Sequence, residues 1–302
     1  MKKIIAFLVF TTSSILISAQ VDSTLYTEPV FLEEESNEIE DTYLSTRIVN
    51  GHSIETLKKG TLEFRIEHKF GDAAGDLGGI NTLYGLDNAT DIRFAFEYGL
   101  TNNLMIGAGR SRGNGTPYSA LLDGFIKYRI VKQNKNSIPV SITYLGTTSY
   151  SYMTASTVKI DVSYFPKWYH RMAYSSQLNI AKKIKNKLSL AVIPTIVYRN
   201  YVAEADQNLL FSLGSGINYA INSKVNVGIE YYANFPKKNT RSNYQNSFSI
   251  GVDWITFGHN FKVFLTNATG LGETQFIPYT NSDWNKGQFR LGFCVGRKYM
   301  KE

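Results

Sequence analysis

The first residues with a chemical pattern form a possible nucleophile motif. Gly109-Arg110-Ser111-Arg112-Gly113 matches G-x-S-x-G, the hydrolase elbow that needs a strand before the serine and a helix after it. A strand is expected before Gly109, but residues 114–117, Asn-Gly-Thr-Pro, have the composition of a loop. The motif therefore does not predict a catalytic serine.

A histidine raises a second possibility, a lipid hydrolase built on the wall of a membrane protein. His68 falls on the apolar face of its expected strand, beside Ile66 and Phe70. A nucleophile must lie within hydrogen-bond reach of its base, and no serine with a neighbouring asparagine stands in a matching pattern. We predict no enzyme and no catalytic residue, and we keep an outer-membrane phospholipase-like hydrolase as a minor alternative.

Acidic and histidine residues do not predict a metal site. The segment 71–90 and its border contain four aspartates: Asp72, Asp76, Asp87 and Asp91. The order of ligands in a calcium loop is absent there. The other histidines are His52, His170 and His259. None has a cysteine or carboxylate at metal-ligand spacing, so we expect no metal and no cofactor.

The most specific pattern is charge at alternate positions of apolar segments. From residue 60 onward, apolar residues recur at every second position, which is the period of a half-buried strand. The charged residues on the other parity are Glu63, Arg65, Glu67, Arg93, Glu97, Asp123, Lys127, Arg129, Glu230, Asp253 and Arg290. If the apolar parity faces lipid, these side chains line a lumen. They then either border a water-filled pore or pair with one another and plug it, and both interpretations stay open.

Twelve segments show this alternation or a similar apolar pattern. They are 60–70, 92–98, 104–110, 122–130, 138–145, 174–182, 188–198, 208–219, 225–232, 247–254, 260–266 and 288–299. Short connections alternate with long ones along the chain, and the long ones cover roughly 71–90, 111–120, 146–172, 199–207, 233–246 and 267–287. The pattern predicts an all-β fold, an antiparallel up-and-down transmembrane β-barrel of about 12 strands, with short periplasmic turns and long extracellular loops.

Aromatic residues indicate two membrane interfaces. They make up 14% of the chain, with 20 Tyr and 18 Phe, although mean hydropathy is slightly negative. Near the short turns stand Tyr98, Tyr128, Tyr219 and Trp254, and toward the long loops we expect Phe70, Tyr144, Tyr198 and Tyr231. Amphipathic rings favour the headgroup level, so the two groups predict two aromatic belts.

The N-terminus predicts export. Residues 1–19 combine a basic start, an apolar stretch and a terminal Ala19, as a cleaved signal peptide does. We expect residues 20–59 to form an acidic, partly disordered periplasmic leader, and 60–302 the barrel in the cell outer membrane. The lone Cys294 excludes an intrachain disulfide.

Several stretches resemble a known family. They are Arg47-Ile48-Val49-Asn50-Gly51-His52-Ser53-Ile54-Glu55-Thr56, Gly85-Leu86-Asp87-Asn88-Ala89-Thr90-Asp91-Ile92-Arg93, Gly258-His259-Asn260-Phe261, Leu265-Thr266-Asn267-Ala268 and Arg290-Leu291-Gly292-Phe293. Over residues 46–300 the chain resembles an outer-membrane β-barrel family of Gram-negative bacteria classed as domain of unknown function 5777. The resemblance implies a barrel in the outer membrane and brings no activity, ligand or catalytic residue. Cys294 stands where the family would lead us to expect a polar residue.

These patterns favour a narrow channel or uptake pore for small polar or ionic solutes. The alternative is a closed structural or interaction barrel that docks a periplasmic or surface partner, for instance through the leader. Outer-membrane lipid and lipopolysaccharide are expected partners. The formal charge is only +7 and its basic residues are dispersed, so nucleic-acid binding is not predicted.

Overall fold

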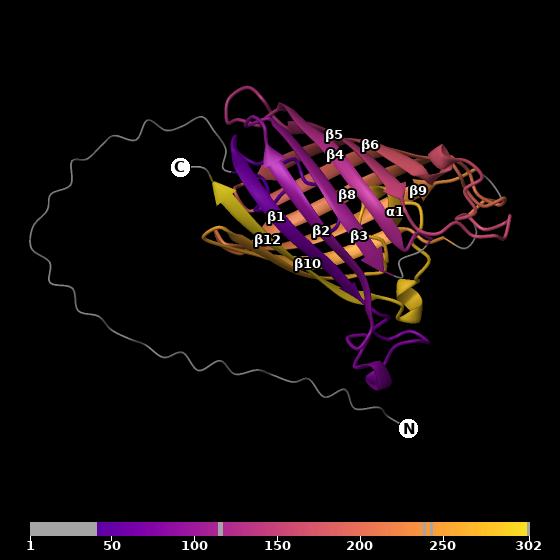
Figure 1. The fold of residues 1–302 in the computed structure, drawn as a ribbon. Coiled ribbons are helices and arrows are strands. Elements are labelled where there is room, and N and C mark those ends of the chain that lie inside the picture. Colours follow the sequence, from indigo (N-terminus) through magenta and orange to yellow (C-terminus); the bar gives the residue numbers. More distant parts are fainter. Residues whose placement is uncertain (1–40, 114–116, 238–239, 242–243, 301–302) are drawn as a thin grey trace, which may run out of the picture. The chain divides into compact units, whose positions relative to one another are not determined.

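Alternating side chains build a closed β-barrel (Figure 1). In this computed structural model the described residues are 41–113, 117–237, 240–241 and 244–300, and all belong to one compact unit, Asn37–Glu302. They form twelve antiparallel strands, each paired with its neighbour in sequence, and β12 pairs back with β1. The expected signal peptide, 1–19, lies outside the described residues.

The strands follow the alternating segments closely. Their bounds are β1 Thr61–Phe70, β2 Ala89–Gly99, β3 Leu104–Gly113, β4 Ala120–Val131, β5 Ser141–Ser151, β6 Met172–Ile184, β7 Leu188–Arg199, β8 Leu209–Ala220, β9 Val225–Phe235, β10 Ser247–Thr256, β11 His259–Thr266 and β12 Arg290–Met300. Helical structure is confined to short turns: η1 Ile80–Thr82, η2 Trp168–Arg171, α1 Glu273–Phe276 and η3 Trp284–Lys286. Among the described residues, no helix is long and apolar enough to cross a membrane.

The two faces of the wall differ in burial and chemistry. In β7 and β8, buried and exposed residues alternate strictly over most of their length. The exposed parity includes four aliphatic residues that are 42–49% accessible on the outer surface, Val192, Ile196, Leu213 and Ile217. A continuous apolar outer surface of this kind suits lipid, so the expected transmembrane barrel is confirmed as the fold.

One expected belt residue belongs to the other end of the barrel. Tyr144 of β5 pairs with Tyr128 of β4, which places it near the short turns. The error arose because β5 does not end at Leu145: small polar residues continue it to Ser151. Tyr174, which pairs with Tyr198, takes the place of Tyr144 near the long loops.

The connections alternate less strictly than expected. The connection between β3 and β4, residues 114–119, was predicted to be long, yet it is shorter than the β4–β5 turn at 132–140. β3 continues through Gly113, which consumes part of the predicted loop. Of the remaining loop-end connections, the β7–β8 loop at 200–208 equals the β4–β5 turn in length and the others are longer.

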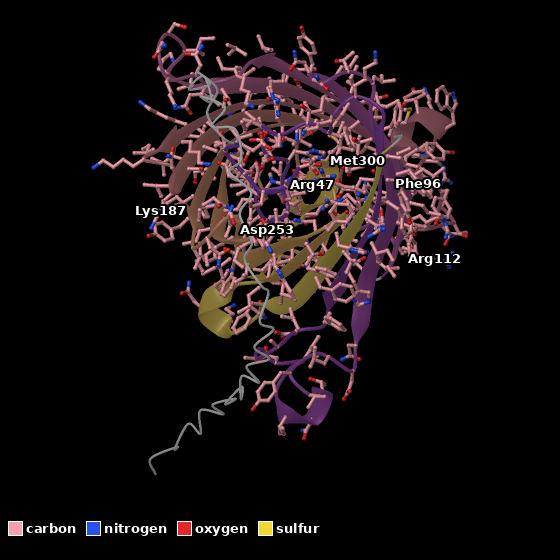
Figure 2. All side chains as sticks on the ribbon, turned by 90° about the vertical axis from the view of Figure 1, so that its left-hand side faces the viewer. Arg47, Phe96, Arg112, Lys187, Asp253 and Met300 are labelled. Atoms are coloured by element: carbon pink, nitrogen blue, oxygen red, sulfur yellow. The ribbon has the colours of Figure 1, made fainter. Side chains whose placement is uncertain are left out.

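The interior of the barrel is filled from both ends (Figure 2). Residues 42–57, which we call the lumen segment, are almost all buried, and Arg47 lies within the ring of strands. Residues 267–282 of the β11–β12 connection, which we call the inner loop, are likewise mostly buried and contain α1. The lumen segment was expected in the leader 20–59, ahead of the barrel, but its own polar and apolar contacts hold it inside.

Leu213→Arg tests the lipid-facing parity. Leu213 lies near the middle of β8 on the exposed face. A cation near the bilayer midplane should destabilise the barrel by about 2–4 kcal/mol. Thermal unfolding in lipid vesicles measures the loss. Phe257→Arg is the matched control, because Phe257 is 92% exposed in the turn between β10 and β11 and should change stability little.

Candidate functional site

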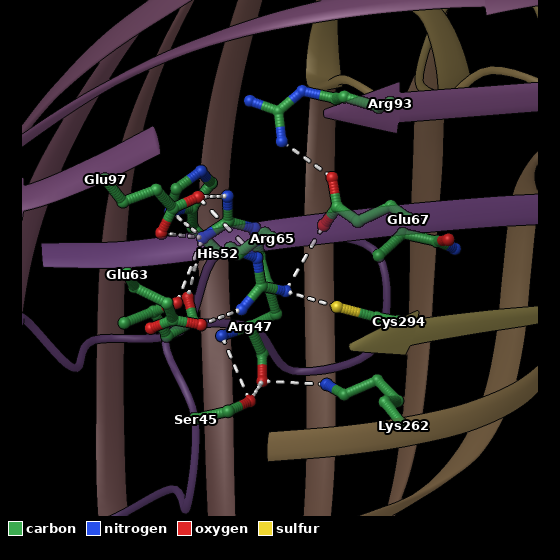
Figure 3. A network of polar contacts seen from close by, with 12 residues as sticks. Ser45, Arg47, His52, Glu63, Arg65, Glu67, Arg93, Glu97, Lys262 and Cys294 are labelled. Carbon is green, nitrogen blue, oxygen red and sulfur yellow. Dashed lines mark hydrogen bonds and ion pairs between the residues drawn. The ribbon is translucent and has the colours of Figure 1, made fainter. Parts of the chain in front are cut away.

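The inner face of β1 is the centre of a charged wall (Figure 3). Arg65 is 1% accessible and donates from Nη1 to Glu63 Oε1 at 2.8 Å and from Nη2 to Glu67 Oε1 at 3.2 Å. Its Nη2 also lies 3.0 Å from the Sγ of Cys294 on β12. A buried guanidinium is tolerated only with such partners, so β1 needs both carboxylates.

Arg93 of β2 extends the wall to β4. It donates from Nη1 to Glu67 Oε2 at 2.6 Å, and from Nε and Nη2 to the two oxygens of Asp123 at 2.9 and 2.6 Å. Gly109 of β3 makes room for this bidentate pair, because a Cβ there would lie 2.7 Å from the Arg93 guanidinium. The glycine of the G-x-S-x-G match therefore serves packing inside the barrel.

Arg47 brings a cation from the lumen segment to this wall. Its Nη2 lies 2.5 Å from Glu97 Oε1 on β2, and Arg65 Nε lies 3.7 Å from the same oxygen. The Arg47 guanidinium also stands over the Phe125 ring, 5.6 Å from its centroid. Glu97 is thus shared between a fixed cation of the wall and a cation that arrives with the segment.

Glu230 of β9 holds the backbone of the lumen segment. Its Oε2 accepts from Val49 N at 3.1 Å and Gly51 N at 3.0 Å, while Oε1 accepts from Asn50 N at 3.3 Å and Gly51 N at 3.1 Å. A side chain at position 51 would collide with Tyr232, whose hydroxyl lies 2.4 Å from the Cβ position. Gly51 therefore permits the close approach on which this carboxylate cradle depends.

Two lysines of the wall bind carbonyl groups of the same segment. Lys262 Nζ of β11 donates to Arg47 O at 3.0 Å and Ile48 O at 2.5 Å. Lys127 Nζ of β4 donates to Thr46 O at 3.2 Å and Glu55 O at 2.5 Å. These donors satisfy backbone oxygens that have no strand partner, as buried polar groups require.

β6–β8 contribute apolar side chains to the interior, among buried polar residues such as Gln177 and Asn179. Ile48, Val49 and Ile54 belong to a buried cluster with residues of β6–β8 and of the inner loop. The wall and loop members of this cluster include Ala181, Ala191, Ile193, Val197, Leu210, Phe264, Phe276 and Ile277. The lumen segment therefore contacts charged side chains of β2, β4, β9 and β11, and it packs its apolar side chains toward β6–β8.

His52 and Glu273 join the lumen segment to the inner loop. His52 Nε2 lies 3.9 Å from Glu273 Oε1, and His52 N donates to that oxygen at 3.4 Å. Arg47 Nη1 lies 3.0 Å from His52 Nδ1, and since arginine can only donate, Nδ1 accepts and the proton is on Nε2. Burial, with the neighbouring Arg47, lowers the pKa of His52 well below its usual value. Burial raises the pKa of Glu273 to about 6.

A second carboxylate of the segment faces the turn end. Glu55 Oε2 lies 2.7 Å from Arg129 Nη2, and its Oε1 accepts from Thr42 N at 2.8 Å. Burial raises the pKa of Glu55 although Arg129 opposes the rise. Asp41, the last residue of the acidic run, lies 3.6 Å from Lys132 Nζ, and its carbonyl accepts from Lys183 Nζ at 2.9 Å.

Little free space remains between the segment and the charged wall. A cavity of about 20 Å³ is bordered by Arg47, His52, Arg93, Asp123 and Glu273, among others. This volume suits roughly one water molecule. The lumen segment and the inner loop therefore occupy most of the interior beside this part of the wall.

The structure places the expected lumen-lining residues on the inner parity. Glu63, Arg65, Glu67, Arg93, Glu97, Lys127, Arg129, Glu230, Asp253 and Arg290 are buried, and Asp123 is partly buried. Lys262 was missed. It lies 3.2 Å from Asp253 Oδ2, and its alternation with Phe261 and Val263 in β11 was a usable signal.

The residues of the hydrolase alternative are not brought together. Ser111 of β3 is buried on the inner parity, whereas His68 of β1 lies on the outer parity beside Phe70 and Phe293. The wall of the barrel separates them. Within the part of the chain that the structure describes, no group of three His, Cys, Asp or Glu residues could hold a metal ion.

Comparisons with known proteins give one family and several distant structural neighbours. A family described as "Membrane bound beta barrel domain (DUF5777)" matches residues 43–299, which covers most of the lumen segment and the strands. One similar solved structure is a NanC porin, with 10% sequence identity, coverage of 80% of this chain and 100% of that chain, and a TM-score of 0.48. A KdgM porin has 11% identity, covers 80% of this chain and 99% of that chain, and has a TM-score of 0.46. The COG4313 outer membrane channel from Pseudomonas putida F1 has 14% identity, covers 82% of this chain and 98% of that chain, and has a TM-score of 0.44. No curated protein matches the sequence.

Glu230→Ala should loosen the lumen segment. The substitution leaves the backbone N–H groups of residues 49–51 without an acceptor. Each buried N–H group that loses its acceptor destabilises the seated segment by about 1–3 kcal/mol. Their hydrogen exchange, followed by mass spectrometry, should accelerate about 10-fold or more. Asp123→Asn is the control, because this carboxylate bonds to Arg93 of the wall and not to the segment. Unchanged exchange in Glu230→Ala would show that the cradle does not hold the segment.

Glu273→Gln should remove one component of the pH dependence of stability. The folded protein holds the pKa of Glu273 at about 6, above the ordinary 4.5, so it takes up a proton before the unfolded chain does. The stability contributed by protonated Glu273 is therefore fully present below pH 4.5 and is lost as pH rises through 6. The free energy of unfolding that Glu273 contributes at low pH, and that is lost at high pH, is about 2 kcal/mol.

The measurement is thermal unfolding in detergent across this pH range for wild type and variant. Subtracting the two profiles removes most of the opposite contribution of His52, which the variant retains. If the stability of wild type and variant changed in parallel with pH, Glu273 would not be the source of this pH dependence.

Proposed function

The chain belongs to the DUF5777 family of membrane-bound β-barrel domains, and from this premise we propose that it is an outer-membrane channel for small polar or ionic solutes, closed by its own lumen segment. One observation carries the proposal. The wall that contacts the segment carries charges of both signs. The polar groups of such a wall can be satisfied either by the segment or by water. The channel is shut when residues 42–57 are seated and conducts when they leave.

A permanently filled barrel would not need this wall. Burying a charge costs free energy that its partner only partly offsets, and an apolar filling of similar volume is often as stable or more so. β6–β8 already present apolar side chains to the segment. The charged part of the wall, on β1, β2, β4, β9 and β11, is therefore the part of the lumen suited to hydration.

The segment's attachment also suits release. Its strongest links to the charged wall are hydrogen bonds to backbone groups and the Arg47–Glu97 pair, all of which water can replace once the lumen hydrates. The small cavity beside Arg93 and Asp123 has room for about one water molecule between the wall and the segment. Solutes would pass along this side.

The charge of the wall suits polar solutes of either sign. The buried carboxylates include Glu63, Glu67, Glu97, Glu230 and Asp253, and the buried cations include Arg65, Arg93, Lys127, Lys262 and Arg290. Rings of a single sign would favour ions of the other sign. Interleaved charges give no such strong preference.

An interaction barrel is the second candidate, and a specific observation favours it. The apolar cluster joins the lumen segment, the wall and the inner loop into one core, which a plug built only for release would not require. Asp41 also contacts Lys132 of the β4–β5 turn and Lys183 near the end of β6, which places the start of the described chain at the turn end of the barrel. In this alternative the preceding acidic residues present a docking site to a periplasmic partner.

Single-channel recording in planar bilayers separates the two candidates. Wild-type protein should show rare conductance steps, and Glu230→Ala should show them at least about 10-fold more often, matching its faster exchange at residues 49–51. Asp123→Asn is the control for a changed wall charge with the segment still seated.

Two outcomes would contradict the gated channel. Absence of conductance in Glu230→Ala, although exchange shows its segment released, would favour the interaction barrel. Steady conductance in wild type with residues 49–51 still protected would show that the segment is not the gate.

A further inference from the structure

A separate pocket lies on the outside of the barrel, where β9, β10 and β11 meet the long loops. It has a volume of about 360 Å³ and is lined by Tyr231, Gln245, Asn246, Phe248, Asn267, Asp283 and Trp284. Tyr231 and Phe248 are paired residues of β9 and β10 on the outer parity. Pockets of this size that combine aromatic surface with a few polar groups are typical of small-ligand sites.

Three aromatic rings form its apolar part and are fixed in place. Trp284 stacks on Phe289, with ring centroids 4.9 Å apart, and meets Phe248 edge to face at 5.2 Å. Its Nε1 donates to Phe248 O at 3.3 Å. Tyr231 supplies the third ring. The pocket is therefore held open by contacts within the protein.

Its polar floor is also rigid. Asn267 Nδ2 donates to Asn246 O at 2.9 Å and Ser282 O at 3.0 Å, while its Oδ1 accepts from Phe248 N at 2.9 Å. Asn246 donates to the Tyr231 hydroxyl at 2.7 Å and accepts from Asn234 N at 3.0 Å. These two asparagines use their hydrogen-bonding groups to shape the pocket.

Other polar groups of the pocket retain capacity for a ligand. The Tyr231 hydroxyl accepts from Asn246 and still has a proton to donate. Asp283 uses Oδ1 for Asn285 N at 2.9 Å, which leaves Oδ2 as an acceptor. The exposed Gln245 carboxamide can both donate and accept, and among the described residues no partner is recorded for it.

From this set we propose that the pocket binds a neutral or amino sugar. A pyranose ring has C–H faces that pack on aromatic rings and a rim of hydroxyls that bond to amides, hydroxyls and carboxylates. An acyl chain would leave the polar groups without partners at a cost. The lining has no cation, and Asp283 disfavours an anionic ligand. An extended peptide has no free strand edge here, because β9 and β10 pair with each other and with β8 and β11.

Two sources could supply such a sugar at the loop end of an outer-membrane barrel. One is the saccharide of lipopolysaccharide, which is anchored in the lipid beside Tyr231. The other is a free polysaccharide at the cell surface. Both present the same ring chemistry, so the experiment must distinguish them.

The test measures binding to the full-length protein in nanodiscs by isothermal titration calorimetry. The probes are intact lipopolysaccharide, the core oligosaccharide released from it by mild acid, and dextran. Tyr231→Phe and Gln245→Ala should each weaken binding of the recognised probe about 2- to 10-fold, the range expected for one hydrogen bond. Tyr198→Phe is the matched control, because Tyr198 is an exposed tyrosine of the same belt outside this pocket and should leave binding unchanged.

Each outcome decides the proposal. Binding of intact lipopolysaccharide and its core oligosaccharide, weakened by both variants, supports a lipid-anchored sugar. Binding of dextran with the same sensitivity supports a free polysaccharide. The proposal is overturned if no probe binds, or if lipopolysaccharide binds equally well to wild type and to the Tyr231→Phe, Gln245→Ala double variant, since the lipid then binds elsewhere. None of these measurements uses conductance, so the test of the pocket is independent of the proposed gating.

Discussion

The structure depends on one constraint: a charge enclosed by a membrane barrel must have a partner. The inner parity of β1, β2 and β4 carries Arg65, Glu97 and Lys127, all nearly inaccessible. Cations and carboxylates of the wall satisfy one another only in part. The lumen segment supplies what is missing, with Arg47 for Glu97 and backbone carbonyls for Lys127. A wall of this composition therefore requires either the segment or water, and here the segment supplies its partners.

The same constraint explains why the lumen has two unlike halves. Toward β6–β8 the segment buries Ile48 and Ile54 among alanine and aliphatic side chains, and Asn179 and Ser189 add hydrogen bonds to its carbonyl groups. Toward the charged half it is held by directional bonds, above all the Glu230 cradle. Apolar packing strengthens closure in water and is indifferent to pH, whereas the polar bonds compete with water and include titratable groups. Closure thus combines a nonspecific and a specific component.

The sequence predicts the wall much better than its filling. Strand number, strand order and the parity of residues such as Arg93 and Glu230 follow from a period of two, because burial on one face of each strand imposes it. The limit appears at Gly146, where small polar residues hide the continuation of β5. The position of the lumen segment leaves no comparable pattern. Glu230 binds the N–H groups of residues 49–51 and Lys262 binds carbonyls of 47 and 48, and every residue offers such groups whatever its side chain.

The β11–β12 connection links the interior of the barrel to its outer surface. Its inner loop places Glu273 beside His52 and Phe276 in the apolar cluster, while its next residues, Asp283 and Trp284, line the outer pocket. Asn267 stands at the start of the same connection and bonds to Ser282 near its end. If the inner loop moves to widen the lumen, these bonds must stretch or break, and the pocket changes shape with it. The inner loop and the outer pocket are therefore parts of one connection, joined by the bond between Asn267 and Ser282.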